Sequence, residues 1–235
     1  MRIVALADTH TFERDLPAVP AGDVFVHAGD LCRAGTLEEQ RPVARWIQNL
    51  PHPHKIVVAG NHDWCFVREP NEAIAILGPT IHYLQDREVA IEGVRFWGSP
   101  WQPEYNNWAF NLPRGPALAE KWALIPKGID VLITHGPPFS IGDYSGDDPI
   151  RHGCRDLLAA MPRIRPLLHL CGHIHQTGGF QNRDGIAFAN VTTWECERGP
   201  TVIDLDIASR TVTPVEVPPA ENRPSTGVFV NGQPI

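Results

Sequence analysis

The sequence has few cysteines, and none of them has metal-binding or disulfide spacing. Five cysteines are scattered along 235 residues without a C-x-x-C pair. An odd number of separated cysteines is typical of free thiols in a reducing compartment, so we expect no disulfide bond. The same scarcity excludes a zinc site built from thiolates.

Long apolar runs and cationic clusters are missing too. No run approaches the roughly 20 apolar residues that a membrane-spanning helix needs, and the apolar start "MRIVALADTH" is too short for a signal peptide. We therefore expect a cytoplasmic protein with no membrane partner.

The net charge of −7 argues against binding of extended nucleic acid, which requires clustered Lys and Arg. There is no glycine-rich phosphate loop with its lysine, so nucleotide-driven phosphoryl transfer has little support.

The composition is typical of one compact domain, because 43% of the residues are hydrophobic and 20% are charged. We expect this domain to span residues 1–213, with an aromatic and proline-rich elaboration at 97–126. The remaining 214–235 segment is rich in Pro, Gly and polar residues. Its Asn-Gly pair indicates a peripheral hairpin, with an unstructured tail as the alternative.

Short apolar, β-rich runs alternate with amphipathic segments. Polar or glycine-containing breaks end these runs, as in RIVALADTH, DVFVHAGDL, HKIVVAGNHD, DVLITHGPP and LLHLCGHIH. We expect helices over 36–49, 72–77, 117–124 and 155–161. Thr36 and Glu39 have the spacing of an N-terminal capping box. Fully apolar strands indicate burial on both faces, so the pattern predicts a layered α/β sandwich in which a second sheet packs on the first.

Five of the strand-like runs are followed by residues that commonly ligate metals. In an α/β sheet the carboxyl ends of the strands meet at one crevice, so these side chains should converge there. They are Asp8, His10, Asp30, Asn61, His135, His173 and His175. Carboxylate, amide and imidazole groups without thiolates suit Mn, Fe, Zn, Ni or Co.

Seven ligand groups are too many for one open catalytic ion and suit two ions that share a bridging carboxylate. Alternate residues of an extended segment point the same way. Asp8 with His10, and His173 with His175, can therefore each reach one small volume. We expect two divalent ions. Manganese is the metal we favour, and iron, zinc, nickel and cobalt are alternatives.

The ordered set DTH, GD, GNHD, THG and GHIH resembles the five motifs of the calcineurin-like metallophosphoesterase superfamily. These motifs extend from Asp8 to His175. The stretches GSPWQPEYNNWAF, DVLITHGPP, HGCRDLL and LHLCGHIHQTGG are similar to the metallophosphoesterase-domain-containing proteins, and this narrower similarity extends to about Ile207. The resemblance implies the four-layer α/β/β/α sandwich of the superfamily.

The resemblance also implies a role for each motif position. The first metal would be held by Asp8, His10, Asp30 and His175. The second metal would share Asp30 as a bridge and take Asn61, His135 and His173. His62 would ligate no metal; it would stand beside the substrate phosphate and protonate the leaving group, and Asp63 would orient the His62 ring.

The function that this set implies is hydrolysis of small phosphodiesters, including cyclic and other nucleotide-type substrates, by a hydroxide that bridges the two metals. The motif segments contain no Lys or Arg to hold a monoester dianion, which favours diesters. A phosphomonoesterase or protein phosphatase with the same centre is an alternative, and its candidate cations are Arg33, Arg68, Arg114 and Arg151. A non-catalytic nucleotide-binding scaffold is a second alternative. The sequence does not indicate an oligomeric state.

Other residues near the motifs have two interpretations. Trp101, Trp108 and Phe110 of the elaboration suit either a wall that stacks a nucleobase or a packed core. Asp143, Asp147 and Asp148 suit either support of the ligands or a solvated acidic loop. The remaining histidines, among which His27 and His152 lie nearest to motif segments, are expected to be structural or surface residues.

Overall fold

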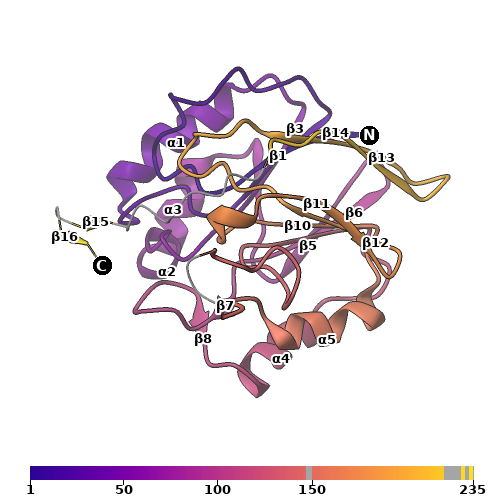
Figure 1. Ribbon diagram of the computed structural model, residues 1–235. Helices are drawn as coiled ribbons and strands as arrows, with labels where there is room; N and C mark the ends of the chain where they lie inside the picture. Colours follow the sequence, from indigo (N-terminus) through magenta and orange to yellow (C-terminus); the bar gives the residue numbers. More distant parts are fainter. Residues whose placement is uncertain (147–149, 220–228, 231–232, 235) are drawn as a thin grey trace.

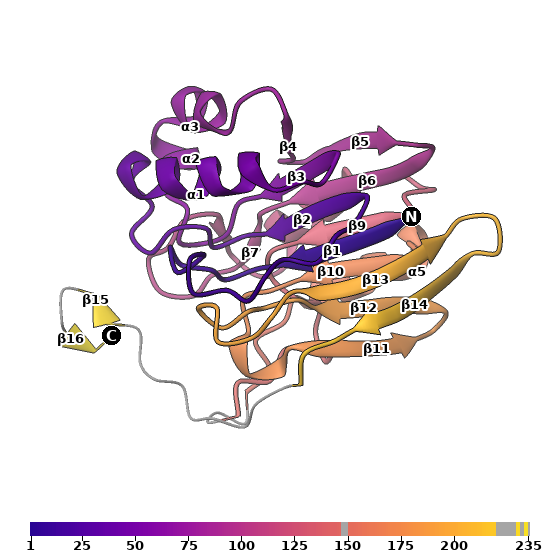
Figure 2. The same cartoon turned by 90° about the horizontal axis from the view of Figure 1, so that it is seen from above.

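The computed structural model describes residues 1–146, 150–219, 229–230 and 233–234. Two six-stranded sheets pack face to face, and helices cover the outer face of each sheet (Figure 1 and Figure 2). The layer order is α/β/β/α, which confirms the fold class predicted from the sequence.

The first sheet has the order β14-β13-β1-β2-β3-β4. Its parallel strands are β1 (Arg2–Leu6), β2 (Val24–Ala28), β3 (His54–Val58) and β4 (Ile81–Tyr83). Two antiparallel strands complete it, β13 (Thr201–Asp206) beside β1 and β14 (Thr211–Glu216) beside β13. Every residue of β2 is buried, which explains why this run is apolar throughout.

The second sheet has the order β11-β12-β10-β9-β6-β5. Its parallel strands are β6 (Val94–Ser99), β9 (Val131–Thr134), β10 (Leu168–Cys171) and β12 (Ile186–Asn190). The edge strands β5 (Arg87–Ile91) and β11 (Gly179–Arg183) pair with them antiparallel.

The helices fall into two groups, one packed on each sheet, and the two groups lie apart in Figure 1. Next to the first sheet lie α1 (Leu37–Asn49), α2 (Cys65–Arg68) and α3 (Pro70–Leu77). Next to the second lie α4 (Pro116–Ala123) and α5 (Arg155–Ile164). The four predicted helices are therefore present. Thr36 caps α1 as expected, because its side chain accepts the Glu39 backbone N–H at 3.2 Å.

Three apolar clusters hold these layers together. The central one lies between the sheets and joins Val26 and Ile56 of the first sheet to Phe96 and Ile133 of the second. A second cluster packs α1 and α3 on the first sheet, and a third packs α4 and α5 on the second. Burial of this apolar area is the main stabilising contribution to the fold.

The elaboration at 97–126 has secondary structure of its own. It contains the two short paired strands β7 (Gln102–Pro103) and β8 (Asn111–Leu112), followed by α4. A 3-10 helix (His175–Thr177) follows the GHIH motif. In the part of the chain that the structure describes, no helix has the length and apolar character needed to cross a membrane. All five cysteines are buried free thiols.

The C-terminal boundary differs from the predicted one. Strand β14 continues to Glu216, so the expected limit at residue 213 falls inside it. Pro214 is compatible with this strand because β14 lies at a sheet edge. The predicted hairpin is represented by β15 (Phe229–Val230), which pairs antiparallel with β16 (Gln233–Pro234), while the rest of 220–235 lies outside the described residues.

Candidate metal centre

Five loops that follow parallel strands bring the predicted ligands together. β1, β2 and β3 are neighbours in the first sheet, and β9 and β10 are neighbours in the second. The loops contribute, in chain order, Asp8, His10, Asp30, Asn61, His135, His173 and His175. The first five of these residues are buried and the last two are half-buried.

Neighbouring loops fix an uncommon backbone conformation at several of these positions. Asp8, His10, Asp30 and His173 have φ values of 58°, 46°, 57° and 69°. Non-glycine residues adopt the left-handed region rarely, and they cluster at functional sites. The Asp8 N–H donates to the Gly29 carbonyl at 2.9 Å, and the His10 N–H donates to the Asp30 carbonyl at 3.1 Å. Contacts between loops, rather than local preference, therefore hold the ligands in place.

The first group of ligand atoms comes from Asp8, His10 and His175, and these atoms lie within 4.8 Å of one another. His175 Nε2 is 3.9 Å from Asp8 Oδ1. The His10 and His175 rings meet edge to face, with centroids 5.4 Å apart. Two ligands of one ion, each about 2.0–2.2 Å from it, stand up to roughly 4 Å apart. The spacing therefore suits a shared ion.

The second group comes from Asp30, His135 and His173, with the same spacing limit of 4.8 Å. His135 Nε2 lies 3.3 Å from Asp30 Oδ2 and 2.9 Å from Asn61 Oδ1. The His135 and His173 rings have centroids 5.0 Å apart. Asp30 also lies 3.8 Å from His10 Nε2 of the first group. Asp30 is therefore the carboxylate that adjoins both groups, as a bridging ligand must.

The buried carboxylates and imidazoles shift one another's pKa values. Burial opposes ionisation of Asp30, but the neighbouring imidazoles, His135 first, hold the pKa of that carboxyl well below its usual range. Burial lowers the pKa of His135 as well, yet the Asp30 carboxylate outweighs it and raises the value to about 9. Burial lowers the pKa of His10 and of His173 well below the usual value, so both rings are neutral. Neutral imidazole and ionised carboxylate are the forms that bind metal, and a cation beside Asp30 would replace the proton on His135.

Two further observations fit a metal at this edge of the sheets. His10 Nδ1 donates to the Cys32 carbonyl at 3.1 Å, which leaves a lone pair on Nε2, and this buried Nε2 has no hydrogen-bond partner among the described residues. Glycines also make room for the ligands. A Cβ on Gly60 would collide with Asp30 Oδ1 and His135, and one on Gly172 would lie 2.8 Å from Asp8 Oδ2. The donor set and the space around it therefore suit divalent ions.

His62 lies beside the first group, and a backbone carbonyl holds its ring as another holds the His10 ring. Its Nδ1 lies 2.6 Å from the Arg33 carbonyl oxygen, and its backbone N–H donates to Asp30 Oδ1 at 2.8 Å. A carbonyl only accepts, so Nδ1 carries a proton and Nε2 is left for chemistry. One His62 ring nitrogen also lies within 4.8 Å of the ligand atoms of His10 and Asp30. Spacing alone would admit His62 as a ligand, so its proton-transfer role stays a prediction.

Asp63 has a different role from the expected one. Its carboxylate accepts three backbone N–H groups, from Gly60 at 2.7 Å, Cys32 at 2.9 Å and Leu31 at 3.2 Å. The predicted contact with the His62 ring is wrong, because the partner of that ring is the Arg33 carbonyl. Asp63 is fully buried, and burial followed by the charge of Asp30 raises its pKa to about 6. It joins the loop that carries His62 to the loop that follows Asp30.

The three aromatic candidates of the elaboration have different surroundings in the structure. The Trp101 indole N–H donates to Asp86 at 2.8 Å, and Phe110 is buried against Trp101 with centroids 5.5 Å apart. These two residues take part in the packing of the elaboration, which fits the second of the two interpretations given for them. Trp108 does lie at the site, with its ring 4.0 Å from the His62 ring and tilted by 31°.

The structure places two further aromatic residues near the candidate ligands. The buried Trp194 has its ring 6.1 Å from the His175 ring. Tyr105 is 53% exposed, and its ring lies 6.4 Å from the rings of His173 and His152. No sequence pattern marks this position, because Tyr105 belongs to an irregular segment without periodicity.

The four candidate arginines have partners within the protein. Arg33 lies over the Phe12 ring and Arg68 over the Trp64 ring. Arg114 donates to the carbonyls of Gly153 and His152, and Arg151 pairs with Asp143 at 3.0 Å. Asp143 also accepts the N–H groups of Ser140 and Gly153, so it supports this loop, while Asp147 and Asp148 lie outside the described residues.

His27 is structural, as expected. It is fully buried and its Nε2 lies 3.0 Å from the Thr9 hydroxyl, in the loop between Asp8 and His10. Burial lowers the pKa of His27 to about 3, so the ring is neutral. This contact supports the first ligand loop from the neighbouring strand.

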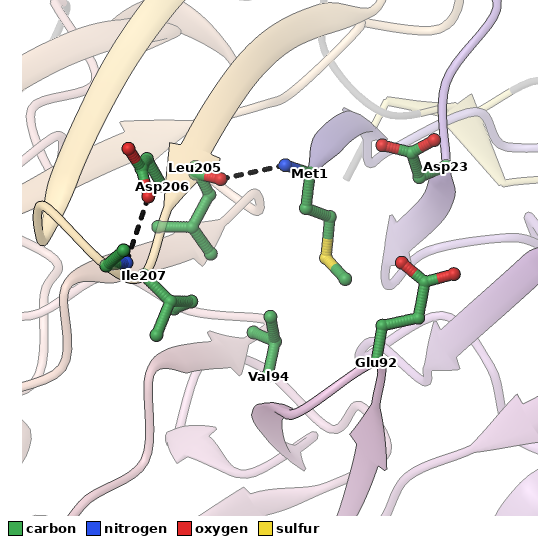
Figure 3. A pocket seen from close by; sticks show the side chains of 8 residues that line it. Met1, Asp23, Glu92, Val94, Leu205, Asp206 and Ile207 are labelled. Carbon is green, nitrogen blue, oxygen red and sulfur yellow. Dashed lines mark hydrogen bonds between the residues drawn. The ribbon is translucent and has the colours of Figure 1, made fainter.

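A cleft of about 340 Å³ lies at the other end of the strands (Figure 3). Its lining includes Met1, which precedes β1, and Leu205 and Asp206 at the carboxyl end of the antiparallel β13. The Met1 amine donates to the Leu205 carbonyl at 2.9 Å. None of the predicted site residues lines this cleft, so the candidate metal centre is a separate feature.

Residues 1–177 match the family model of calcineurin-like phosphoesterases. This match covers all the loops that carry the candidate ligands. The chain belongs to the calcineurin-like phosphoesterases. The fold of this family implies divalent metal ions, and the carboxylates and imidazoles described above are the residues that fit them. The predicted recognition of this superfamily is confirmed.

Relatives of this calcineurin-like phosphoesterase cover most of its length. The human metallophosphoesterase domain-containing protein 1 is 39% identical over 231 residues, which cover 87% of this chain and 71% of that protein. The protein UPF0046 K07C11.7 of Caenorhabditis elegans is 37% identical over 212 residues, covering 85% of this chain and 71% of the relative.

Solved structures show the same fold. The protein TT1561 of Thermus thermophilus has a TM-score of 0.63 at 16% identity, and the match covers 91% of this chain and 97% of that one. Another solved structure has a TM-score of 0.68 at 19% identity, with the same coverage. At these identities the likeness supports the fold alone.

Proposed function

We propose that this chain is a dinuclear metal-dependent phosphodiesterase that acts on small diesters, including cyclic and other nucleotide-type substrates. The observation that carries the proposal is the position of Asp30 between two groups of ligand atoms, with His62 beside it. When bound, a pair of divalent ions neutralises the phosphate oxygens and lowers the pKa of water. We propose manganese as the bound metal, with iron, zinc, nickel and cobalt as alternatives.

Each group of residues in the site would have a different role in this reaction. Asp8, His10, Asp30 and His175 would hold one ion, and Asp30, Asn61, His135 and His173 would hold the other. His62 would give a proton from Nε2 to the departing oxygen, because its Nδ1 is committed to the Arg33 carbonyl. Asp63 would fix the loop that carries Asn61 and His62 to the loop that follows Asp30.

The surroundings of the centre support a diester rather than a monoester. A monoester dianion carries more charge and usually needs Arg or Lys beyond the metals. The four arginines considered for this role each have another partner in the protein. Trp108 against His62 and the exposed Tyr105 near His173 offer apolar faces for the second organic group of a diester. We further propose a small phosphoester or nucleotide as the binding partner, and a cytoplasmic location on the ground of five free thiols.

Parallel kinetics on matched diesters and monoesters with added manganese would test the proposal. We expect catalytic efficiency on nitrophenyl and cyclic nucleotide diesters to exceed that on the corresponding monoesters. A clear monoester preference would instead favour a phosphomonoesterase or protein phosphatase. Nucleotide binding without turnover at any metal concentration would favour a non-catalytic scaffold.

A further inference from the structure

The five residues that follow Asp30 are held by two carboxylates through consecutive backbone N–H groups. We refer to residues 31–35 as the 31–35 loop. Asp63 accepts the N–H groups of Leu31 and Cys32. A single oxygen of Glu39, Oε2, accepts the next three, from Arg33 at 3.1 Å, Ala34 at 2.8 Å and Gly35 at 3.0 Å. Successive N–H groups that converge on one oxygen form a concave anion-binding arrangement, here filled by a side chain of the protein itself.

The carbonyls of the same loop hold two imidazoles near Asp30, those of His10 and His62. The Cys32 carbonyl accepts from His10 Nδ1 at 3.1 Å, and the Arg33 carbonyl accepts from His62 Nδ1 at 2.6 Å. Each carbonyl thereby selects the proton on Nδ1 and leaves Nε2 available. The 31–35 loop thus sets both the tautomer and the direction of each ring.

One peptide unit connects Glu39 directly to His62. The Arg33 carbonyl and the Ala34 N–H belong to the same planar peptide bond, so neither group can turn without the other. The N–H end of this unit donates to Glu39 and the carbonyl end accepts from His62. Hydrogen bonds in such a chain polarise one another, and a charged acceptor at one end strengthens the acceptor at the other.

The loop has little freedom to find another position. Gly35 has φ of 72°, and a Cβ there would collide with the His62 carbonyl and the Trp64 N–H. The His62 ring is also in contact with two other rings, since its centroid lies 4.0 Å from that of Trp108 and 4.6 Å from that of His10. A shift of the Arg33 carbonyl would therefore leave the ring without its hydrogen bond rather than with a new one.

We propose that Glu39 is a positioning residue for His62, acting through the Arg33–Ala34 peptide. The inference rests on the proposed function, since it assumes that His62 protonates the leaving group. It assigns to Glu39 more than a capping role, because the cap of α1 is made by the Thr36 side chain. Glu39 fixes the direction from which Nε2 meets the departing oxygen.

The neighbouring residue supplies a matched control. Glu38 belongs to the same first turn of α1, carries the same charge relative to the helix dipole and is exposed, but no hydrogen bond connects it to the 31–35 loop among the described contacts. Glu39→Gln keeps an oxygen at the same reach without the charge. Glu39→Asp keeps the charge but moves it back by one methylene.

We expect Glu39→Ala and Glu39→Asp to lower kcat on a phenyl diester about 10- to 100-fold, the usual effect of losing a residue that orients an active group. Loss on an activated nitrophenyl diester should be several-fold smaller, because that leaving group scarcely needs a proton. Glu39→Gln should recover most of the phenyl diester rate, and Glu38→Ala should match the wild type on both substrates. Equal losses on the two diesters, or a Glu38→Ala effect as large as that of Glu39→Ala, would overturn the proposal.

A measurement on the metal-free protein separates this inference from the proposed function. In the wild type, the His62 Nδ1 proton should give a protected, downfield NMR signal, and the amide protons of residues 33–35 should exchange slowly. Glu39→Ala should abolish both signatures while the Cys32 amide, held by Asp63, stays protected. An unchanged His62 signal would refute the role of Glu39 even if the wild type hydrolysed diesters. If the wild type hydrolysed nothing but these signatures behaved as expected, only the proposed function would fail.

Discussion

The candidate metal centre and the aromatic elaboration at 97–126 are adjacent regions that differ in how they are built. At the candidate centre, buried polar groups lie at the ends of five parallel strands, and adjacent loops fix left-handed backbone at four candidate ligands. In the elaboration, Trp101 and Phe110 pack on each other and Trp101 donates to Asp86, while Trp108 lies against the His62 ring. The centre is thus characterised by buried polar and charged side chains, and the elaboration mostly by packed aromatic side chains.

This difference determines what each region tolerates. Buried carboxylates and imidazoles at the centre are needed for charge balance, so replacement of one leaves others uncompensated. Aromatic side chains in the elaboration contribute buried area and a few hydrogen bonds, which other side chains can replace in part. Substitutions should therefore affect turnover at the centre and stability in most of the elaboration.

The largest effect is expected at the carboxylate that adjoins both ligand groups. Asp30→Asn removes a charge that lies 3.3 Å from His135 and 3.8 Å from His10. We expect turnover with manganese to fall by more than about 10⁴-fold, beyond the usual loss of a single acid or base, together with loss of bound metal. His175→Asn, at the more exposed edge of the first group, should cost less. Elemental analysis and kinetics of both variants would check this, and an equal or larger loss in His175→Asn would contradict a bridging Asp30.

The next effect separates proton transfer from metal binding. His62→Ala should leave metal content nearly unchanged and lower the rate on diesters with poor leaving groups by about 10²–10⁴-fold. Nitrophenyl diesters should lose less, because their leaving groups scarcely need a proton. Metal content measured beside the two rates decides the issue. Loss of one ion per chain would identify His62 as a ligand, and equal rate losses would remove its role as an acid.

Most of the fold could be predicted from the sequence, and so could the set of residues that meet at the candidate metal centre. An apolar run that ends in Asp, Asn or His indicates a buried parallel strand and also marks its carboxyl end. Asp30 and His135 could therefore be placed at the same edge of the two sheets from the sequence alone. The helix at Leu37–Asn49 is equally predictable from its cap at Thr36. These features depend on local sequence and on strand direction, which short patterns record.

The contacts that orient the ligands could not be predicted. Asp63 follows His62 in the chain, which suggests a contact between their side chains, but the carboxylate binds backbone N–H groups of another loop 31 residues away. The His62 ring is held by a backbone carbonyl, and every residue has one, so no residue type marks Arg33 for this role. Trp101 and Trp108 cannot be distinguished by sequence for a similar reason, since an aromatic side chain serves packing and binding alike.

The smallest expected effect compares these two tryptophans. Trp108→Ala should raise KM for a nucleotide diester roughly 5- to 150-fold, the equivalent of about 1–3 kcal/mol for one stacked base, and should raise KM for a bare aryl diester less. Trp101 donates to Asp86 and lies under Lys121, whose ammonium is 4.2 Å from the ring centre. Trp101→Ala should therefore lower the free energy of unfolding by about 3 kcal/mol and leave the KM ratio of the two substrates unchanged. Denaturant titration with kinetics on both diesters would test the pair. If Trp108→Ala lowered kcat on both substrates without changing the KM ratio, Trp108 would support the His62 ring rather than a nucleobase.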